Sequence, residues 1–94
     1  MIEITTFRLH EGIDAKTFAK LDEQLQTEFF YFQPGLQRRT TACSEDGEWA
    51  SIIVWDSEAC ADAAIDKTEE FATFEHVLAM MDLMTIESCR YNTL

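Results

Sequence analysis

The order in which two hydrophobic periodicities alternate along the chain constrains the fold most. A strand-like segment at 2–9 is followed by apolar residues at three- and four-residue steps, which is typical of an amphipathic helix. Two further strand-like segments, 36–43 and 48–55, flank Asp46-Gly47, a dipeptide typical of a β-hairpin turn. A second helical region and a last strand at 83–91 complete the order strand, helix, strand, strand, helix, strand.

The positions of apolar residues predict which sides of the first strand and the first helix face the core. The apolar positions of the strand change parity between Ile4 and Phe7, which predicts a bulge near Thr5–Thr6. Asp14 is a suitable N-cap for the helix, and Pro34-Gly35 ends it because the residue before a proline avoids the α conformation. The predicted core stripe is Phe18, Leu21, Leu25, Phe29 and Phe32, and the predicted solvent face is Lys16, Lys20, Asp22, Glu23 and Gln26.

The second half of the chain contains a two-faced apolar strand and an interrupted helix. In Trp49–Trp55 both sets of alternating side chains are largely apolar, which indicates a central strand covered on both sides. Asp56 and Ser57 are both suitable N-caps for the helical region that follows. Thr68-Glu69-Glu70 has the composition of a new helix start, so we expect two short helices or one kinked helix.

This order predicts an α+β fold, a ferredoxin-like βαββαβ arrangement with an antiparallel four-stranded sheet, in a single domain spanning 1–94. The two helical regions would cover one face of the sheet. The other face would carry β-branched side chains that are costly to leave in water, at about 25 cal/mol per Å² of apolar surface. We therefore expect two chains to pair their open faces in a homodimer.

Charge and composition exclude several function classes. The net charge is −11, which disfavours binding to nucleic acid and to anionic membranes. No apolar run is long enough to span a membrane, and the N-terminus lacks a signal-peptide pattern, so a cytoplasmic protein is expected. The three cysteines are widely spaced and form no CxxC pair, which argues against a disulfide framework and against a metal site.

Three segments resemble a known superfamily. They are Gln33-Pro34-Gly35-Leu36-Gln37-Arg38-Arg39, then Glu45-Asp46-Gly47-Glu48-Trp49, then Ile52-Ile53-Val54-Trp55-Asp56-Ser57-Glu58-Ala59. In this order they resemble the dimeric α/β-barrel superfamily, and within it the small proteins of the antibiotic biosynthesis monooxygenase type. The resemblance implies a dimeric α/β barrel with ligands held between the helices and the sheet of each subunit. The superfamily includes quinone-forming monooxygenases that use no cofactor, isomerases and many uncharacterised members, so the resemblance specifies the fold more closely than the activity.

The same superfamily includes heme-degrading enzymes, and the resemblance to those is poor. They use an Asn on the first strand, a Trp on the second helix and a His one short helix later. The first strand here has Thr5 and Thr6, and the Trp position falls near Ala64. Close to the His position lies His76, with Glu75 as the alternative alignment. Two of the three parts are missing, so heme degradation is not expected.

Five residues are the candidates for a site. His76 is the candidate catalytic residue, as a general base or ligand contact, because its ordinary pKa lies near neutrality, although its place off the apolar stripe also suits a surface histidine. Trp49 and Trp55 would share a strand face and could stack a planar ligand, or could pack in the core or dimer interface. Tyr31 belongs to the run Phe29–Phe32, in which four aromatic residues cannot all face one core. Phe30 or Tyr31 would therefore face a cavity mouth or a partner subunit, or would be partly exposed.

Arg39 is the fifth candidate. Four arginines fall on predicted strands, and arginine on a sheet can hold a carboxylate or phenolate by paired hydrogen bonds. The alternative is an ion pair with Glu3 or Glu87, or with an acid across the dimer. Arg38 and Arg39 have opposite parity, so at most one of them faces a given pocket.

Three functions stay open at this point. The first is a homodimer that binds a small hydrophobic or aromatic molecule and oxidises it without a cofactor. The second is a non-catalytic ligand-binding or stress-associated module of the same fold, and the third is a structural dimerisation domain. An apolar pocket in the folded chain favours the first two over the third.

Overall fold

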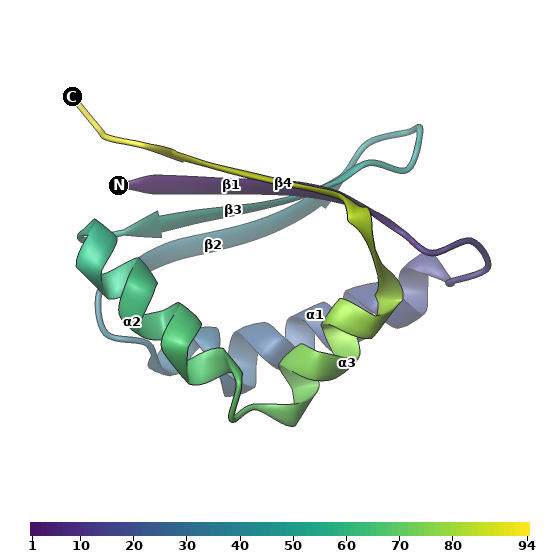
Figure 1. Ribbon diagram of the computed structural model, residues 1–94, viewed down its shortest axis with the longest axis horizontal. Helices are drawn as coiled ribbons and strands as arrows, with labels where there is room; N and C mark the ends of the chain where they lie inside the picture. The colour runs from purple at the N-terminus through teal and green to yellow at the C-terminus, as the bar shows by residue number, and fades with distance from the viewer.

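A four-stranded antiparallel sheet with all helices on one side makes up the computed structural model of residues 1–94 (Figure 1). The elements follow in the order β1 (Ile2–Leu9), α1 (Ala15–Glu28), the 3₁₀ turn η1 (Phe30–Phe32), β2 (Leu36–Cys43), β3 (Trp49–Trp55), α2 (Glu58–Thr68), α3 (Ala72–Met80) and β4 (Met81–Tyr91). The strand order is β2-β3-β1-β4. This is the ferredoxin-like α+β fold that the sequence predicts, and β3 is a central strand as expected.

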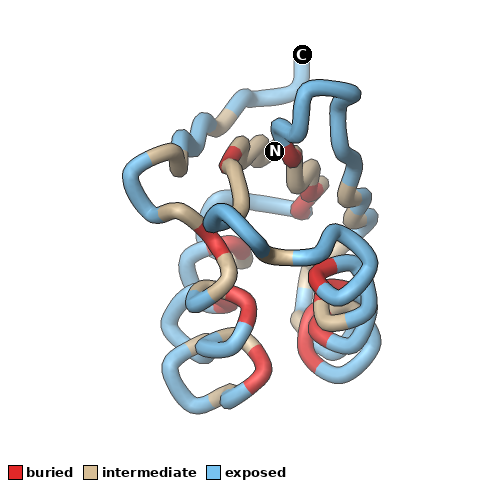
Figure 2. Tube along the Cα trace, turned by 90° about the vertical axis from the view of Figure 1, so that its right-hand side faces the viewer, coloured by how far each residue is buried: buried red, intermediate tan, exposed pale blue.

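The core lies between the sheet and the helices. Figure 2 shows the buried segments of the helices turned toward the space beneath the sheet. Phe18 of α1 meets Phe7 of β1 and Trp49 of β3 edge to face, with ring centres 5.6 and 4.8 Å apart. Edge-to-face aromatic contacts are favourable beyond the area that they bury. These three rings fix α1 against the middle of the sheet.

Helix α1 ends earlier than the sequence suggests. The predicted stripe runs to Phe32, but the α-helix stops at Glu28 and the chain tightens into η1. A 3₁₀ turn has three residues per turn instead of 3.6, which rotates the following side chains away from the helical stripe. Phe30 is therefore buried, and Phe32 is exposed to 76% of its surface, so its assignment to the core was wrong.

A bulge lies next to the predicted position, but its extra residues are on β4. The pairing of β1 with β3 is regular. In the pairing with β4, the single β1 residue between Thr6 and Arg8 stands opposite four residues of β4, 83–86. The change of parity in the sequence has another cause: Ile4 faces away from the helices, while Phe7 packs into the core. Both faces of β1 are apolar, at different positions.

The interruption of the second helical region is confirmed. Helix α2 ends at Thr68 and α3 begins at Ala72, with turn hydrogen bonds from Glu70 and Phe71 across the junction. Ser57 is the N-cap of α2 and accepts a hydrogen bond from the Cys60 backbone N–H at 3.3 Å. The junction places α2 and α3 under different parts of the sheet (Figure 1).

The face of the sheet turned away from the helices is uncovered in the single chain. Its central side chains Ile4, Ile52 and Val54 are only partly buried. The strand β3 is thus central within the sheet, but one chain covers only one of its faces. None of the helices is both long and apolar enough to cross a membrane.

Candidate functional site

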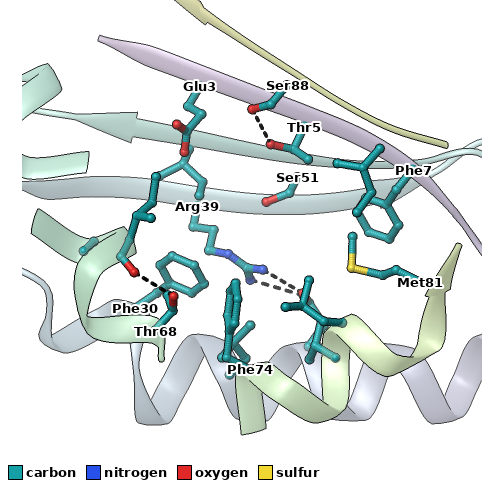
Figure 3. Close-up of a pocket in the computed structure, with 18 of the residues that line it drawn as sticks. Glu3, Thr5, Phe7, Phe30, Arg39, Ser51, Thr68, Phe74, Met81 and Ser88 are labelled. Atoms are coloured by element: carbon teal, nitrogen blue, oxygen red, sulfur yellow. Dashed lines mark hydrogen bonds and ion pairs between the residues drawn. The ribbon is translucent and has the colours of Figure 1, made fainter. Parts of the chain in front are cut away.

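A cavity of about 320 Å³ lies between the sheet and the helices (Figure 3). Every strand and every helix contributes to its wall, and most of the lining side chains are apolar. Ile65 of α2 and Ser88 of β4 line it and are exposed, which marks the side on which it opens to solvent. Its volume is at the lower end of the range of about 300–1,000 Å³ that small-molecule sites occupy.

The floor of the cavity carries a row of hydroxyl groups. Thr5 of β1 pairs directly with Ser51 of β3 on one side and with Ser88 of β4 on the other, and all three line the cavity. Residues directly opposite each other in neighbouring strands lie on the same face of a sheet. The hydroxyls of Thr5 and Ser88 are 3.0 Å apart and hydrogen-bonded (Figure 3), while that of Ser51 has no side-chain partner.

A buried ion pair crosses the cavity from the sheet to α1. The guanidinium of Arg39 donates two hydrogen bonds to the Asp22 carboxylate, at 2.7 and 3.2 Å, and one to the Gln26 side-chain oxygen at 3.2 Å. The two charged side chains are 4% and 11% exposed. The guanidinium also lies 4.4 Å from the ring centre of Phe30, within the range of a cation–π contact. Figure 3 shows the Arg39 head group between the sheet and the helices, beside Phe30.

A second charged network borders the cavity at Glu3. Arg90 of β4 donates to Glu3 of β1 at 2.8 Å and to Glu58 and Asp62 of α2 at 3.1 and 2.8 Å. The hydrogen bonds that Arg90 donates to Glu3 and Asp62 raise the pKa of its guanidinium above the ordinary value. Arg90 thereby joins two neighbouring strands to α2.

Two N–H donors in the cavity wall have no acceptor in the protein. They are Nε of Arg39 and the indole Nε1 of Trp55, and both atoms are buried. Trp55 is 1% exposed. Buried polar atoms in proteins are nearly always hydrogen-bonded. Each of these two donors therefore lacks the acceptor that a buried N–H group usually has.

The structure brings two of the five sequence candidates to the cavity, Arg39 and Trp55. Trp49 is on the same face of β3 as Trp55, but its ring packs against Phe18 in the core and does not line the cavity. The Tyr31 side chain is 60% exposed, outside the cavity, and its hydroxyl accepts a hydrogen bond from Gln26. His76 is exposed on α3 and also lies outside the lining residues, whereas its neighbour Val77 is buried and lines the cavity.

Sequence reasoning missed several residues of the wall. Asp22 was expected on the solvent face of α1, yet it is 8% exposed and bonded to Arg39. The only sign of this ion pair in the sequence is an arginine on a strand together with acidic residues on a helix. That pattern does not identify which acid is the partner of the arginine. The hydroxyl row could have been found from Ser51, a lone polar residue within the otherwise apolar Trp49–Trp55 segment.

Comparisons with known proteins found likeness at the level of structure. No family model matches the chain, and no curated protein matches its sequence. A protein of Nitrosomonas europaea assigned to the antibiotic biosynthesis monooxygenases superposes with a TM-score of 0.81 at 14% identity, over 99% of this chain and 88% of that one. SnoaB, a cofactor-independent oxygenase from Streptomyces nogalater, superposes with a TM-score of 0.77 at 20% identity, over 99% and 94%.

A third solved structure, Rv0793 from Mycobacterium tuberculosis, has a TM-score of 0.74 at 15% identity, over 99% of this chain and 93% of that one. At such identities the likeness concerns the fold, and it extends over nearly the full length of each chain. The chain therefore has the fold of the antibiotic biosynthesis monooxygenase-like proteins.

Proposed function

We propose that this protein binds a flat, hydrophobic aromatic molecule in the cavity between sheet and helices and oxidises it with dioxygen, without a cofactor. The observation that carries the proposal is the cavity itself, which is apolar on most of its wall and polar at a few fixed points. A purely structural dimerisation domain has no need of such a space. The likeness in fold to SnoaB, a cofactor-independent oxygenase, supports the same reading.

The proposed chemistry asks little of the protein. A phenol or hydroquinone loses a proton, and the electron-rich anion forms a carbon–oxygen bond with dioxygen to give a peroxide. The peroxide takes up a proton and loses water, which leaves a carbonyl group on the ring. One oxygen atom of dioxygen enters the product and the other leaves as water.

The carboxylates at the cavity are already engaged. Asp22 is bonded to Arg39, and Glu3 is bonded to Arg90. Both oxygens of Asp22 accept hydrogen bonds from Arg39, and Glu3 accepts one from Arg90, so both carboxylates are committed to partners within the protein. The proposed reaction therefore uses no base in the cavity wall, and the proton of the substrate hydroxyl leaves to water. The same observation keeps a second candidate in place, a binder of the same ligands without turnover.

The test separates the two candidates. A panel of hydroquinones and dihydroxynaphthalenes is offered to the protein in an oxygen electrode, and binding of each is followed by calorimetry. The oxygenase requires oxygen uptake with quinone formation above the rate without protein. Binding without any uptake across the panel would support the non-catalytic binder, and no binding at all would refute both.

We further propose that the working unit is a homodimer joined through the uncovered face of the sheet. Ile4, Ile52 and Val54 form an apolar centre on that face, and they are only partly buried in the single chain. A dimer would remove this surface from water. Sedimentation of the wild type at micromolar concentration should give twice the 10.8 kDa chain mass, and Ile52→Glu should give the chain mass. Ala19→Glu, on the exposed side of α1, is the matched control and should stay dimeric.

A wild-type protein that sediments as a stable monomer would contradict the dimer. It would leave the binding proposal intact, because every residue of the cavity wall belongs to one chain.

A further inference from the structure

The indole N–H of Trp55 is a hydrogen-bond donor without an acceptor. An indole N–H donates a single hydrogen bond and accepts none. The N–H of Trp55 is buried at the end of β3, its residue lines the cavity, and no acceptor of the protein lies within reach. A buried tryptophan N–H usually has a partner, since an unpaired polar group away from water is costly. An acceptor atom in the cavity would supply that partner.

Arg39 on β2 also carries an N–H group without an acceptor. Two of its nitrogens are bonded to Asp22 and Gln26, and they hold the guanidinium in one orientation over Phe30. Its third nitrogen, Nε, is buried and has no acceptor. Arg39 pairs with Ile53, and Trp55 is two residues further along the same face of β3. The two residues that carry the unpaired donors therefore lie close together on adjacent strands, and both line the cavity.

The charges of the wall indicate which kind of acceptor atom the two donors would bind. The charge of Asp22 neutralises that of Arg39, and the charge of Arg90 neutralises that of Glu3. A ligand therefore need not be negatively charged, but it must offer an oxygen lone pair to the unpaired N–H groups. A carbonyl or phenolic oxygen supplies lone pairs without requiring a full charge.

We propose that Trp55 and Arg39 select ligands that carry an acceptor oxygen on the aromatic ring system, through the indole N–H and the Arg39 Nε–H. This inference rests on the proposed ligand-binding function and names the chemical group by which the ligand is recognised. The oxygen lies beside Arg39 and Trp55, while the rings lie against the apolar wall formed by residues such as Phe74, Val77 and Leu78.

The test uses a pair of probes of nearly equal shape. 1-Acetylnaphthalene presents a carbonyl oxygen, and 1-isopropenylnaphthalene replaces that oxygen by a methylene group. Neither requires deprotonation or turnover. Calorimetric titration of the wild type should show the acetyl compound binding about three- to tenfold more tightly, the ratio expected for one net hydrogen bond.

Two variants test whether the Trp55 N–H and the Arg39 Nε–H cause the tighter binding of the acetyl compound. Trp55→Phe keeps an aromatic ring and removes the N–H, and Arg39→Lys keeps a positive charge for Asp22 and removes Nε. Each should reduce the preference for the acetyl compound at least twofold, and Trp49→Phe, a core tryptophan outside the cavity, should leave it unchanged. Thermal unfolding of each variant confirms that it is folded at the temperature of the titration.

The outcomes are distinct. Equal binding of the two probes to the wild type would overturn the inference and leave an apolar ligand site in place. A preference that survives in both Trp55→Phe and Arg39→Lys would overturn it as well. Failure of both probes to bind would refute the proposed function together with the inference, whereas binding without oxygen uptake would refute only the oxygenase.

Discussion

Arg39 on β2 and Asp22 on α1 form a buried, two-pronged ion pair that spans the layer between sheet and helix. Within a mostly apolar layer such a pair gives little net stability, because removing both charges from water costs about as much as their attraction returns. Its clearest consequence is positional. It holds the Arg39 head group over Phe30 at the wall of the cavity.

Breaking this pair from one side should be far more damaging than replacing both partners. Arg39→Met leaves the Asp22 carboxylate buried without a partner and should lower the free energy of unfolding by about 3–5 kcal/mol. The double replacement Asp22→Leu with Arg39→Met should recover most of that loss. Urea unfolding of the wild type, the single variant and the double variant measures the difference. A double variant as unstable as the single one would mean that the pair itself stabilises the fold.

Gly35, between η1 and β2, should tolerate no side chain. Its φ is +82°, and a Cβ there would overlap the side chain of Cys60 at the start of α2. Gly12 has a similar φ, +86°, but open space around it. Gly12→Ala should therefore cost only the backbone strain of about 1–2 kcal/mol, and Gly35→Ala should cost clearly more. Chemical denaturation compares them, and equal losses would show that α2 yields to the extra methyl group.

Removal of Arg90 should loosen α2 from the sheet. Arg90→Met leaves Glu3, whose side chain is 12% exposed, without its partner and cuts the bonds to Glu58 and Asp62. We expect a loss of about 1–2 kcal/mol and faster amide exchange in 58–68 than in α1. Lys20→Met, at an exposed position of α1, is the control. Unchanged exchange in α2 would indicate that apolar packing alone positions this helix.

The β2–β3 hairpin should respond to acid through Asp46. Hydrogen bonds from Ser44 and then Arg8 hold the pKa of the Asp46 carboxyl below its ordinary value. A carboxyl whose pKa is lowered on folding contributes stability above its ordinary pKa, and that contribution is lost as the pH falls through the lowered pKa. Asp46→Asn should therefore be less stable than the wild type at neutral pH, with the gap closing in acid.

Urea unfolding at neutral pH and in acid measures that gap, and an NMR titration of the Asp46 carboxyl gives its pKa directly. A carboxyl that titrates at or above its ordinary pKa would contradict the prediction. Because Asp46 is exposed, the stability change should be small.

The sequence predicted the sheet and the broken helix because each depends on local signals. The alternation in Trp49–Trp55, the Asp46-Gly47 turn and the new helix start at Thr68–Glu70 are all short-range patterns. The end of α1 was harder. A helical stripe that includes Phe29 and Phe32 fits the sequence, but the approach to Pro34 tightens the chain into a 3₁₀ turn and leaves Phe32 outside.

The site was predicted only in part, for a physical reason. Arg39 and Trp55 stood out by residue type and parity, and both line the cavity. Asp22 did not, because its burial depends on Arg39, which is 17 residues away in the chain and reaches it from the sheet. The hydroxyl row depends on register among three strands, which links Thr5 to Ser51 and to Ser88 across long stretches of chain. Such pairings are fixed by the assembled sheet.

The central claim is that the cavity beneath the sheet holds an aromatic ligand, and a calorimetric titration with a dihydroxynaphthalene tests it most directly. The wild type should bind one molecule per chain. Ser51→Leu, which fills the middle of the floor, should abolish binding while the protein stays folded, and Thr40→Leu on the opposite face should bind as the wild type does. Equal binding by Ser51→Leu and the wild type, or no binding by the wild type, would contradict the account.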